Sequence, residues 1–315
     1  MRKVSLVAFA LAVTLASGGV HAAGTLEDTT FEQRLNLMID GQPWLGTVNT
    51  PVIDLGDTEH RYETYKVYTH VYDFDGQDVI TKGPVGQFCH HRGIFTGWNH
   101  THVGDDRYDT WHMGDSTQEH QRWDHFEADD DRAQQVQTIH WKDDDGRLLI
   151  SEVRTITAHK HPDGHRIVDF ESELTAEAGD IELRGDSHHA GVQIRLAEEV
   201  NDNQDETIYT LQPGGEEMDN DEVVNAFWVM CSAPVGGQRY WIIHMTPPTH
   251  PTGIQDGSNA PMYSIRRYAR FGAFYEPDLT EGEPKTFHFR FVINDEEITE
   301  EEAEALYQEY SDEVQ

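Results

Sequence analysis

Short runs of β-branched and aromatic residues, separated by turns that end in Asp-Gly, dominate the hydrophobic pattern of the chain. These runs cover residues 65–72, 134–141, 148–159 and 165–175, and the turns between them are residues 73–76, 143–146 and 161–164. Runs of this length bounded by Asp-Gly predict strands joined by hairpins. The acidic run at 143–146 lacks the spaced ligands of an EF-hand loop, so we interpret it as a hairpin turn.

Strict alternation marks a further strand near the C-terminus. Phe287, Phe289, Phe291 and Ile293 are separated by single residues. This period of two is typical of a strand with one buried face. The pattern as a whole predicts an all-β fold, a large antiparallel β-sandwich with a short C-terminal helix.

The predicted helix begins at a capping box. Thr299 and Glu302 have the required spacing, and an apolar stripe at helical spacing follows them, consisting of Ala303, Leu306, Tyr307, Tyr310 and Val314. We expect this stripe to pack on the sandwich. The many acids of the same segment then form a solvated outer face.

The first 22 residues have the features of a signal peptide. Arg2 and Lys3 precede an apolar run at residues 4–16, and Ala22 supplies a small residue before the cut. We therefore expect export to the periplasm or the medium, with residues 23–315 as a single domain. No later run is long and apolar enough for a membrane helix, so we expect no membrane insertion. Cys89 and Cys231 are the two cysteines, and the sequence leaves a disulfide between them open.

Acidic residues greatly outnumber basic ones, with 58 Asp and Glu against 23 Lys and Arg and a net charge of −35. Such a surface repels nucleic acid and anionic membranes, so we expect neither as a partner. Because the acids are spread along the chain, we also expect them to repel one another and to suit the protein to salt.

Candidate chemistry concentrates between residues 90 and 125. Seven of the 19 histidines lie in this window, well above their proportional share. Imidazole titrates near neutral pH and binds transition metals, and tryptophan rings offer stacking surfaces for sugars. A second pair, His188 and His189, lies among glycines. On a strand, His90 and His91 would point to opposite faces, whereas on a loop both could enter one site. We predict that this segment and the segment around His188 converge.

Segments around these histidines are similar to segments of a known protein family. Four segments, residues 89–99 (CHHRGIFTGWN), 109–112 (DTWH), 185–191 (GDSHHAG) with Arg195, and 267–272 (RYARFG), are similar to a family of secreted bacterial proteins labelled "methane oxygenase PmoA-like". The literal label would require transmembrane helices, which the chain lacks. Members of the family are often met beside sugar-degrading enzymes, so the resemblance implies a role in glycan metabolism.

Three kinds of site can be built from these residues. One uses a histidine as general acid or base on a bound sugar, one uses histidines and carboxylates to hold a divalent metal, and one only binds glycan. The candidate catalytic residues are His90, His91, Arg92, Asn99, Asp109, His112 and Arg195; the candidate substrate-binding residues are Trp98, Trp111 and Arg267; and the candidate metal ligands are His188 and His189.

The sequence thus predicts a carbohydrate-active enzyme of lyase or hydrolase type with a histidine-rich site. It leaves open whether that site depends on a divalent metal. A non-catalytic carbohydrate-binding module is one alternative, and a metal-dependent oxygenase is another. The phosphate-binding loop, the zinc-protease motif and the nucleophile elbow are missing, which argues against nucleotide, zinc-protease and esterase functions.

Overall fold

The computed structural model describes residues 24–28, 32–49, 66–84, 86–249 and 261–314. Within these residues the strands form three antiparallel sheets, and the predicted all-β sandwich with a short C-terminal helix is confirmed. The signal peptide predicted for residues 1–22 lies outside the described residues.

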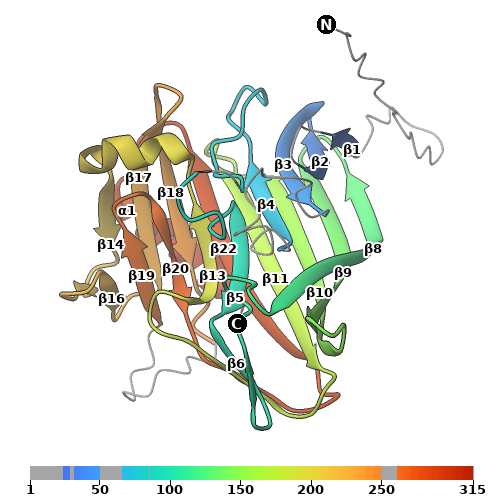
Figure 1. The fold of residues 1–315 in the computed structure, drawn as a ribbon. Coiled ribbons are helices and arrows are strands. Elements are labelled where there is room, and N and C mark those ends of the chain that lie inside the picture. Colours follow the sequence, from blue (N-terminus) through green and yellow to red (C-terminus); the bar gives the residue numbers. More distant parts are fainter. Residues whose placement is uncertain (1–23, 29–31, 50–65, 85, 250–260, 315) are drawn as a thin grey trace, which may run out of the picture.

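The largest sheet has ten described strands. Their spatial order is β1 (Gly24–Asp28), β2 (Gln33–Ile39), β3 (Gln42–Val48), β4 (Tyr68–Val71), β5 (Ile94–Trp98), β13 (Ala190–Arg195), β20 (Arg270–Phe274), β19 (Met262–Arg266), β16 (Glu222–Val224) and β15 (Glu216–Glu217). Neighbours β5, β13 and β20 come from distant parts of the chain, and Figure 1 shows β5 and β13 side by side.

The second sheet has eight described strands. Their order is β14 (Ile208–Leu211), β17 (Trp228–Val235), β18 (Gln238–Met245), β22 (Lys285–Asn294), β11 (Arg166–Ala176), β10 (Leu148–Lys160), β9 (Arg132–Asp143) and β8 (Ser116–Ala128). Strands β8 to β11 pair consecutively as a meander, which confirms the hairpins predicted at residues 143–146 and 161–164. The turn at residues 143–146 joins β9 to β10, where Asp143 caps the backbone N–H of Asp145 at 3.1 Å, so its interpretation as a hairpin turn is confirmed.

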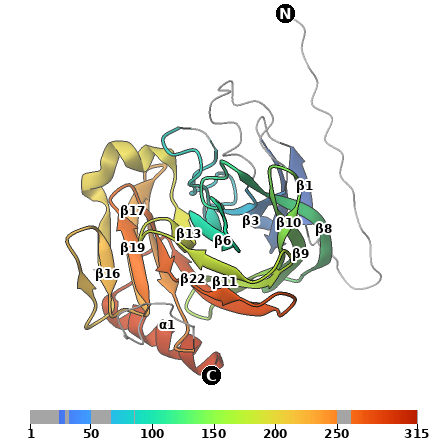
Figure 2. The same ribbon diagram turned by 60° about the horizontal axis from the view of Figure 1, so that its bottom comes forward.

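A small third sheet and two helices complete the described elements. The sheet has the order β21 (Asp278–Leu279), β12 (Ile181–Arg184), β6 (His100–Val103) and β7 (Asp106–Tyr108), and the helices are the 3₁₀ helix η2 (Glu198–Glu206) and the α-helix α1 (Glu300–Glu313). Figure 2 shows β8 to β11 and β22 as a curved layer, with β3, β6 and β13 on its concave side.

The main core lies between the two large sheets. Strand β22 contributes Phe287, Phe289, Phe291 and Ile293, as the alternation predicts. Val292 on the opposite face of β22 is also buried, because α1 covers that face and forms a second apolar cluster with it.

The C-terminal helix begins at the predicted capping box. Thr299 accepts a hydrogen bond from the Glu302 backbone N–H, and the Glu302 side chain accepts one in return. Leu306, Tyr307 and Tyr310 pack on the outer face of the eight-stranded sheet. The predicted apolar stripe is thus confirmed, and most of the acids of α1 are exposed. No helix among the described residues has the length and apolar character to cross a membrane.

Candidate functional site

The site is built on the outer face of the ten-stranded sheet, at β5, β13, β20 and β19. Because neighbouring residues of a strand point to opposite faces, Ile194 faces the core while Gln193 and Arg195 face outward. Arg195 lies opposite Arg270 in the pairing of β13 with β20. This outward face is nevertheless buried, since Gln193, Arg195 and Arg270 are at most 1% exposed.

Three loops cover this face. They are residues 88–93 before β5, residues 109–115 before β8 and residues 185–189 before β13. Gly97 on β5 allows the second loop to lie directly on the strand, because a Cβ there would be 2.3 Å from the carbonyl oxygen of Thr110. Phe88 and Met113, in two of these loops, have positive φ angles of 55° and 65°. Strained backbone of this kind often occurs at functional sites.

A histidine cluster forms where the loops meet. The ring of His90 lies 4.3 Å from the ring of His91 and 4.4 Å from the ring of His112, measured between centroids. His112 in turn lies 5.0 Å from His189. The segments around His91 and His188 therefore converge, and this prediction is confirmed. His90 and His91 lie on a loop, so both rings enter the same cluster.

Two of these histidines are each held by an aspartate three residues earlier in the chain. His112 Nδ1 lies 2.8 Å from Asp109 Oδ2, and His189 Nδ1 lies 2.7 Å from Asp186 Oδ1. Asn99 donates a hydrogen bond of 2.9 Å to the other oxygen of Asp186.

Hydrogen bonds decide the charge of both aspartates. Burial alone would raise the pKa of Asp109 and of Asp186, but hydrogen bonds from the paired histidine and from nearby backbone N–H groups hold each pKa below its usual range. Both carboxylates are therefore ionised at neutral pH. An ionised aspartate favours the tautomer that carries its proton on Nδ1, which leaves Nε2 of each ring available for proton transfer.

His91 has a different environment. It is 2% exposed, it contacts the rings of Phe88 and Tyr268, and neither ring nitrogen has a hydrogen-bond partner among the described residues. Burial, with the nearby charge of Arg270, holds the pKa of His91 well below its usual value. His91 is therefore a neutral imidazole at neutral pH.

Buried cations surround the cluster. The ammonium of Lys66 donates to the carbonyl oxygen of Trp111, and Lys82 lies 3.7 Å from Glu198. Burial lowers the pKa of Lys82 to about 8, and the pKa of Arg195 to about 10. Lysine is rarely this buried, yet Lys66 and Lys82 are 3% and 2% exposed.

Several predicted site residues come together as expected. His90, His91, Asp109, His112 and His189 form the cluster, and Asn99 supports it through Asp186. His188 lies at its border, where Nδ1 is 2.8 Å from the hydroxyl oxygen of Ser264. Burial lowers the pKa of His188 to about 4. Arg195 lies on the sheet face beneath, with its guanidinium 4.5 Å from the ring centre of Tyr268.

Other predicted residues lie elsewhere or are inaccessible. Trp98 as a sugar-stacking surface is wrong, because it is fully buried in the core and its indole N–H donates to the carbonyl oxygen of Tyr275 at 2.8 Å. Trp111 borders the cluster but is also fully buried. The half-exposed Arg267 faces Glu217 at 3.7 Å, and Arg92 is buried with its guanidinium 5.6 Å from the ring centre of Tyr68.

The histidines and cysteines were also candidates for a metal site and a disulfide. Within the part of the chain that the structure describes, no group of three His, Cys, Asp or Glu side chains has a metal-binding arrangement. The assignment of His188 and His189 as metal ligands stays a prediction. Cys89 and Cys231 carry thiols and are not joined by a disulfide.

Sequence reasoning missed the cationic part of the site. Lys66, Lys82 and Arg270 were not among the candidates, and neither was Tyr268, whose ring lies 6.2 Å from that of His91. Arg270 and Tyr268 belong to the 267–272 motif, which was the available signal. Lys66 and Lys82 had none, since single lysines are usually surface residues.

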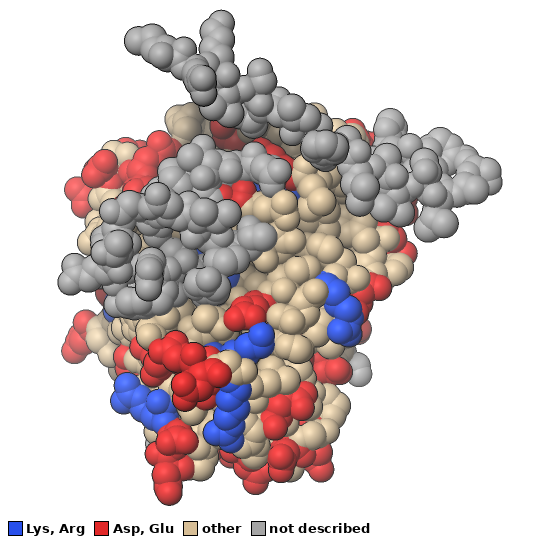
Figure 3. Space-filling model, turned by 45° about the vertical axis from the view of Figure 1, so that its right-hand side comes forward, with Lys and Arg blue, Asp and Glu red and all other residues tan. Residues whose placement is uncertain are grey.

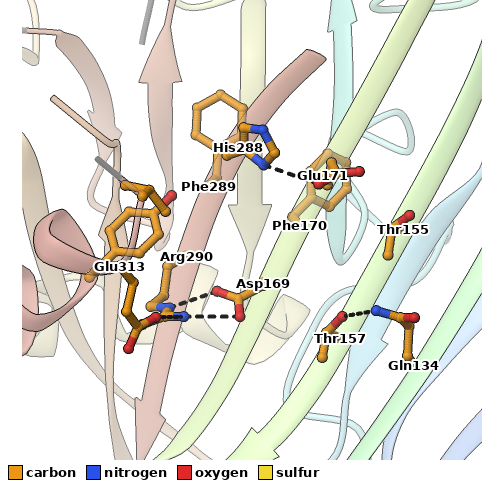
Figure 4. Close-up of a pocket in the computed structure, with 12 residues that line it drawn as sticks. Gln134, Thr155, Thr157, Asp169, Phe170, Glu171, His288, Phe289, Arg290 and Glu313 are labelled. Atoms are coloured by element: carbon orange, nitrogen blue, oxygen red, sulfur yellow. Dashed lines mark hydrogen bonds and ion pairs between the residues drawn. The ribbon is translucent and has the colours of Figure 1, made fainter. Parts of the chain in front are cut away.

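A separate groove lies on the outer face of the eight-stranded sheet, beside α1 (Figure 4). Its volume is about 270 Å³. The charged side chains in it neutralise one another: Arg290 donates to both carboxylate oxygens of Asp169, and His288 lies 3.2 Å from Glu171. Because these groups already satisfy each other, we place the candidate site at the histidine cluster.

The surface of the molecule carries many acidic side chains. Figure 3 shows acidic side chains scattered over one face of the molecule, with basic ones between them. The buried cations of the site are therefore a local exception in a chain of net charge −35.

Comparisons with known proteins give a family and distant likenesses in structure. A family model described as "Family of unknown function (DUF6807)" matches residues 34–308. No curated protein sequence matches the chain. The solved structure of HI1317 is similar at a TM-score of 0.42 and 7% identity, covering 89% of this chain and 99% of that one. A GalM/aldose epimerase homologue from C. elegans is similar at a TM-score of 0.34 and 10% identity, covering 86% and 99%.

Proposed function

Because the chain belongs to DUF6807, a family of unknown function, we propose its function from the site itself: the protein is an enzyme that cleaves a carbohydrate, with two histidines as general base and general acid. The observation that carries the proposal is the pair of Asp-held imidazoles, His112 and His189, with ring centres 5.0 Å apart. The implied link of the sequence to glycan metabolism supports a carbohydrate as substrate, and the signal-peptide pattern supports action in the periplasm or the medium.

The geometry suits general acid–base catalysis. An aspartate at Nδ1 fixes the ring and stabilises the imidazolium that forms when Nε2 accepts a proton. With two such rings close together, one accepts a proton while the other donates one to the leaving oxygen. In a lyase the accepted proton comes from a C–H group of the sugar, and in a hydrolase it comes from the water that attacks the sugar carbon. Elimination by a lyase and direct attack of water in a hydrolase can both use such a pair.

Non-catalytic binding has less support. A binding module that stacks sugars needs accessible aromatic rings. Trp98 lies in the core between the two large sheets, so this expected stacking surface is not available.

The test is a turnover assay on a glycan panel, with and without chelator. We expect His112→Gln, His189→Gln, Asp109→Asn and Asp186→Asn each to lower turnover by about 10²- to 10⁴-fold, because each removes or misorients an acid–base group. His125→Gln is the matched control, since His125 is half exposed on β8. Unchanged turnover in both histidine variants would remove the pair from the mechanism, and loss of turnover on chelation would favour the metal-dependent alternative.

A further inference from the structure

A row of arginines crosses three strands beneath the histidine cluster. Arg195 on β13 lies opposite Arg270 on β20, and Arg270 lies opposite Arg266 on β19. Directly opposed residues of neighbouring antiparallel strands share one face, so the three side chains emerge on the same side. Like charges in this arrangement destabilise a sheet unless negative charge compensates them.

The two outer arginines have carboxylates nearby. Arg266 Nη1 lies 2.7 Å from Asp221, and Arg195 Nη2 lies 3.9 Å from Glu198. The central Arg270 is 1% exposed and donates to neutral groups, namely the carbonyl oxygen of His188, the side-chain oxygen of Gln193 and the hydroxyl of Ser264. Among the described residues, none of the ion pairs involves Arg270.

Two other buried arginines of the same protein are neutralised by carboxylates, whereas Arg166 donates to three backbone carbonyl oxygens. Arg154 donates to both oxygens of Glu152 at 2.7 and 2.9 Å, and Arg290 donates to both oxygens of Asp169 at 2.6 and 3.0 Å. A chain with 58 acidic residues thus supplies bidentate carboxylates to these arginines but not to Arg270.

The same region has buried donors without acceptors. Nε and Nη1 of Arg195, Nε of Arg270 and Nε1 of Trp111 have no hydrogen-bond partner among the described residues. They lie around His91: its ring is 6.1 Å from Trp111, which is 6.0 Å from the Arg270 guanidinium. On the other side, the Tyr268 ring is 6.2 Å from His91 and 4.5 Å from the Arg195 guanidinium. Buried donors in native proteins normally have acceptors, so this group is suited to an acceptor-rich ligand.

We infer that Arg270 and Arg195, beside His91 and Trp111, bind a carboxylate of the substrate, and that the substrate is therefore an acidic sugar of the uronate type. A carboxylate matches the planar fork of a guanidinium and brings the negative charge that the arginine row lacks. This inference deepens the proposed function and rests on it for the sugar. The substrate carboxylate lies against the sheet face, and proton transfer takes place at the loops above it.

Binding measurements on the full chain test the inference. The probes are short oligosaccharides of glucuronate or galacturonate, their carboxyl-reduced neutral counterparts, and inorganic phosphate, all at one ionic strength and measured by calorimetry. We expect the acidic oligosaccharides to bind at least about 10-fold more tightly than the neutral ones, because a hydrogen bond to a charged group is worth that much or more. His112→Ala should keep this preference, because His112 belongs to the proton-transfer pair.

Substitutions of single arginines identify which residues cause the preference for acidic oligosaccharides. Arg270→Gln should weaken binding of the acidic oligosaccharide by about 10- to 100-fold, and Arg270→Lys should weaken it less because the charge is kept. If Arg270→Gln does not fold, the binding of the acidic oligosaccharide is measured with Arg195→Gln instead. Arg122→Gln is the matched control, since Arg122 is exposed on β8.

Three outcomes would overturn the inference. They are equal binding of acidic and neutral sugars, unchanged binding in both Arg270→Gln and Arg195→Gln, and binding of phosphate in place of uronates. Failure of the proposed function gives a different result, since a binder without turnover would still prefer acidic sugars in the wild type and in His112→Ala.

Discussion

His91 combines nearly complete burial with a pKa held well below its usual value. The unfolded chain takes up a proton at this imidazole as the pH falls through about 6.5, whereas the folded protein does not. Protonation therefore favours the unfolded state. The contribution of His91 to stability is present above the unfolded pKa and is lost as the pH falls below it.

We predict that His91→Gln makes stability less sensitive to pH between about 7.5 and 5. The measurement is the urea midpoint of wild type and variant across this range. His125→Gln, at a half-exposed position, should retain the slope of the wild type. An identical slope in His91→Gln and wild type would contradict the assignment of a depressed pKa.

The residues of the site could be predicted in part. The excess of histidine between residues 90 and 125 located the cluster, because composition alone reveals such an excess. Arg270 could not be assigned, since its role depends on which strand lies beside β13, and strand order is a property of the whole sheet. Trp98 was misassigned because a sequence does not show which face of β5 points into the core.

Among the elements, β5 supports the loop that contains His112, because that loop packs directly on the strand. Gly97 lets the carbonyl of Thr110 approach to 2.3 Å from where a Cβ would stand. A methyl group there must displace backbone, and overpacking of this kind costs about 1–3 kcal/mol.

We predict that Gly97→Ala lowers the free energy of unfolding by about that amount and reduces turnover by shifting His112. Gly114→Ala is the control within the same loop, because a Cβ at Gly114 meets nothing within 4 Å. Denaturant titration of both variants provides the comparison. Equal stability would show that the loop adjusts to the added methyl group.

Elements with a strong local signal were the easiest to predict. The hairpins from β9 to β11 have Asp-Gly turns, and α1 has its capping box, so short-range chemistry defines them. The pairing of β5 with β13 has no local signal, because the two strands lie far apart in the sequence. For the same reason the hairpins of β9 to β11 were predictable and the order of the ten-stranded sheet was not.

For the whole molecule, the net charge of −35 is the dominant electrostatic property. Repulsion among like surface charges opposes folding and is screened by salt. The Debye length falls from about 30 Å at 0.01 M to about 10 Å at 0.1 M ionic strength.

We predict that the thermal midpoint rises over this range of sodium chloride and then levels off. An isosmolar sucrose series at low salt separates screening from solute exclusion. A flat or falling midpoint with sodium chloride would mean that self-repulsion does not limit stability.

The strand order of the ten-stranded sheet also determines when the site can form. Its centre joins β5 to β13 and then to β20, so the ladder beneath the histidines closes only after long intervening loops have been organised. Closing such loops costs chain entropy before any contact compensates for it, which makes non-local sheets slow to fold. The meander of β8 to β11 can form from neighbouring hairpins, whereas Arg195 and Arg270 meet only late. In refolding experiments, the ability to bind an acidic sugar should therefore return after most of the β-structure has formed.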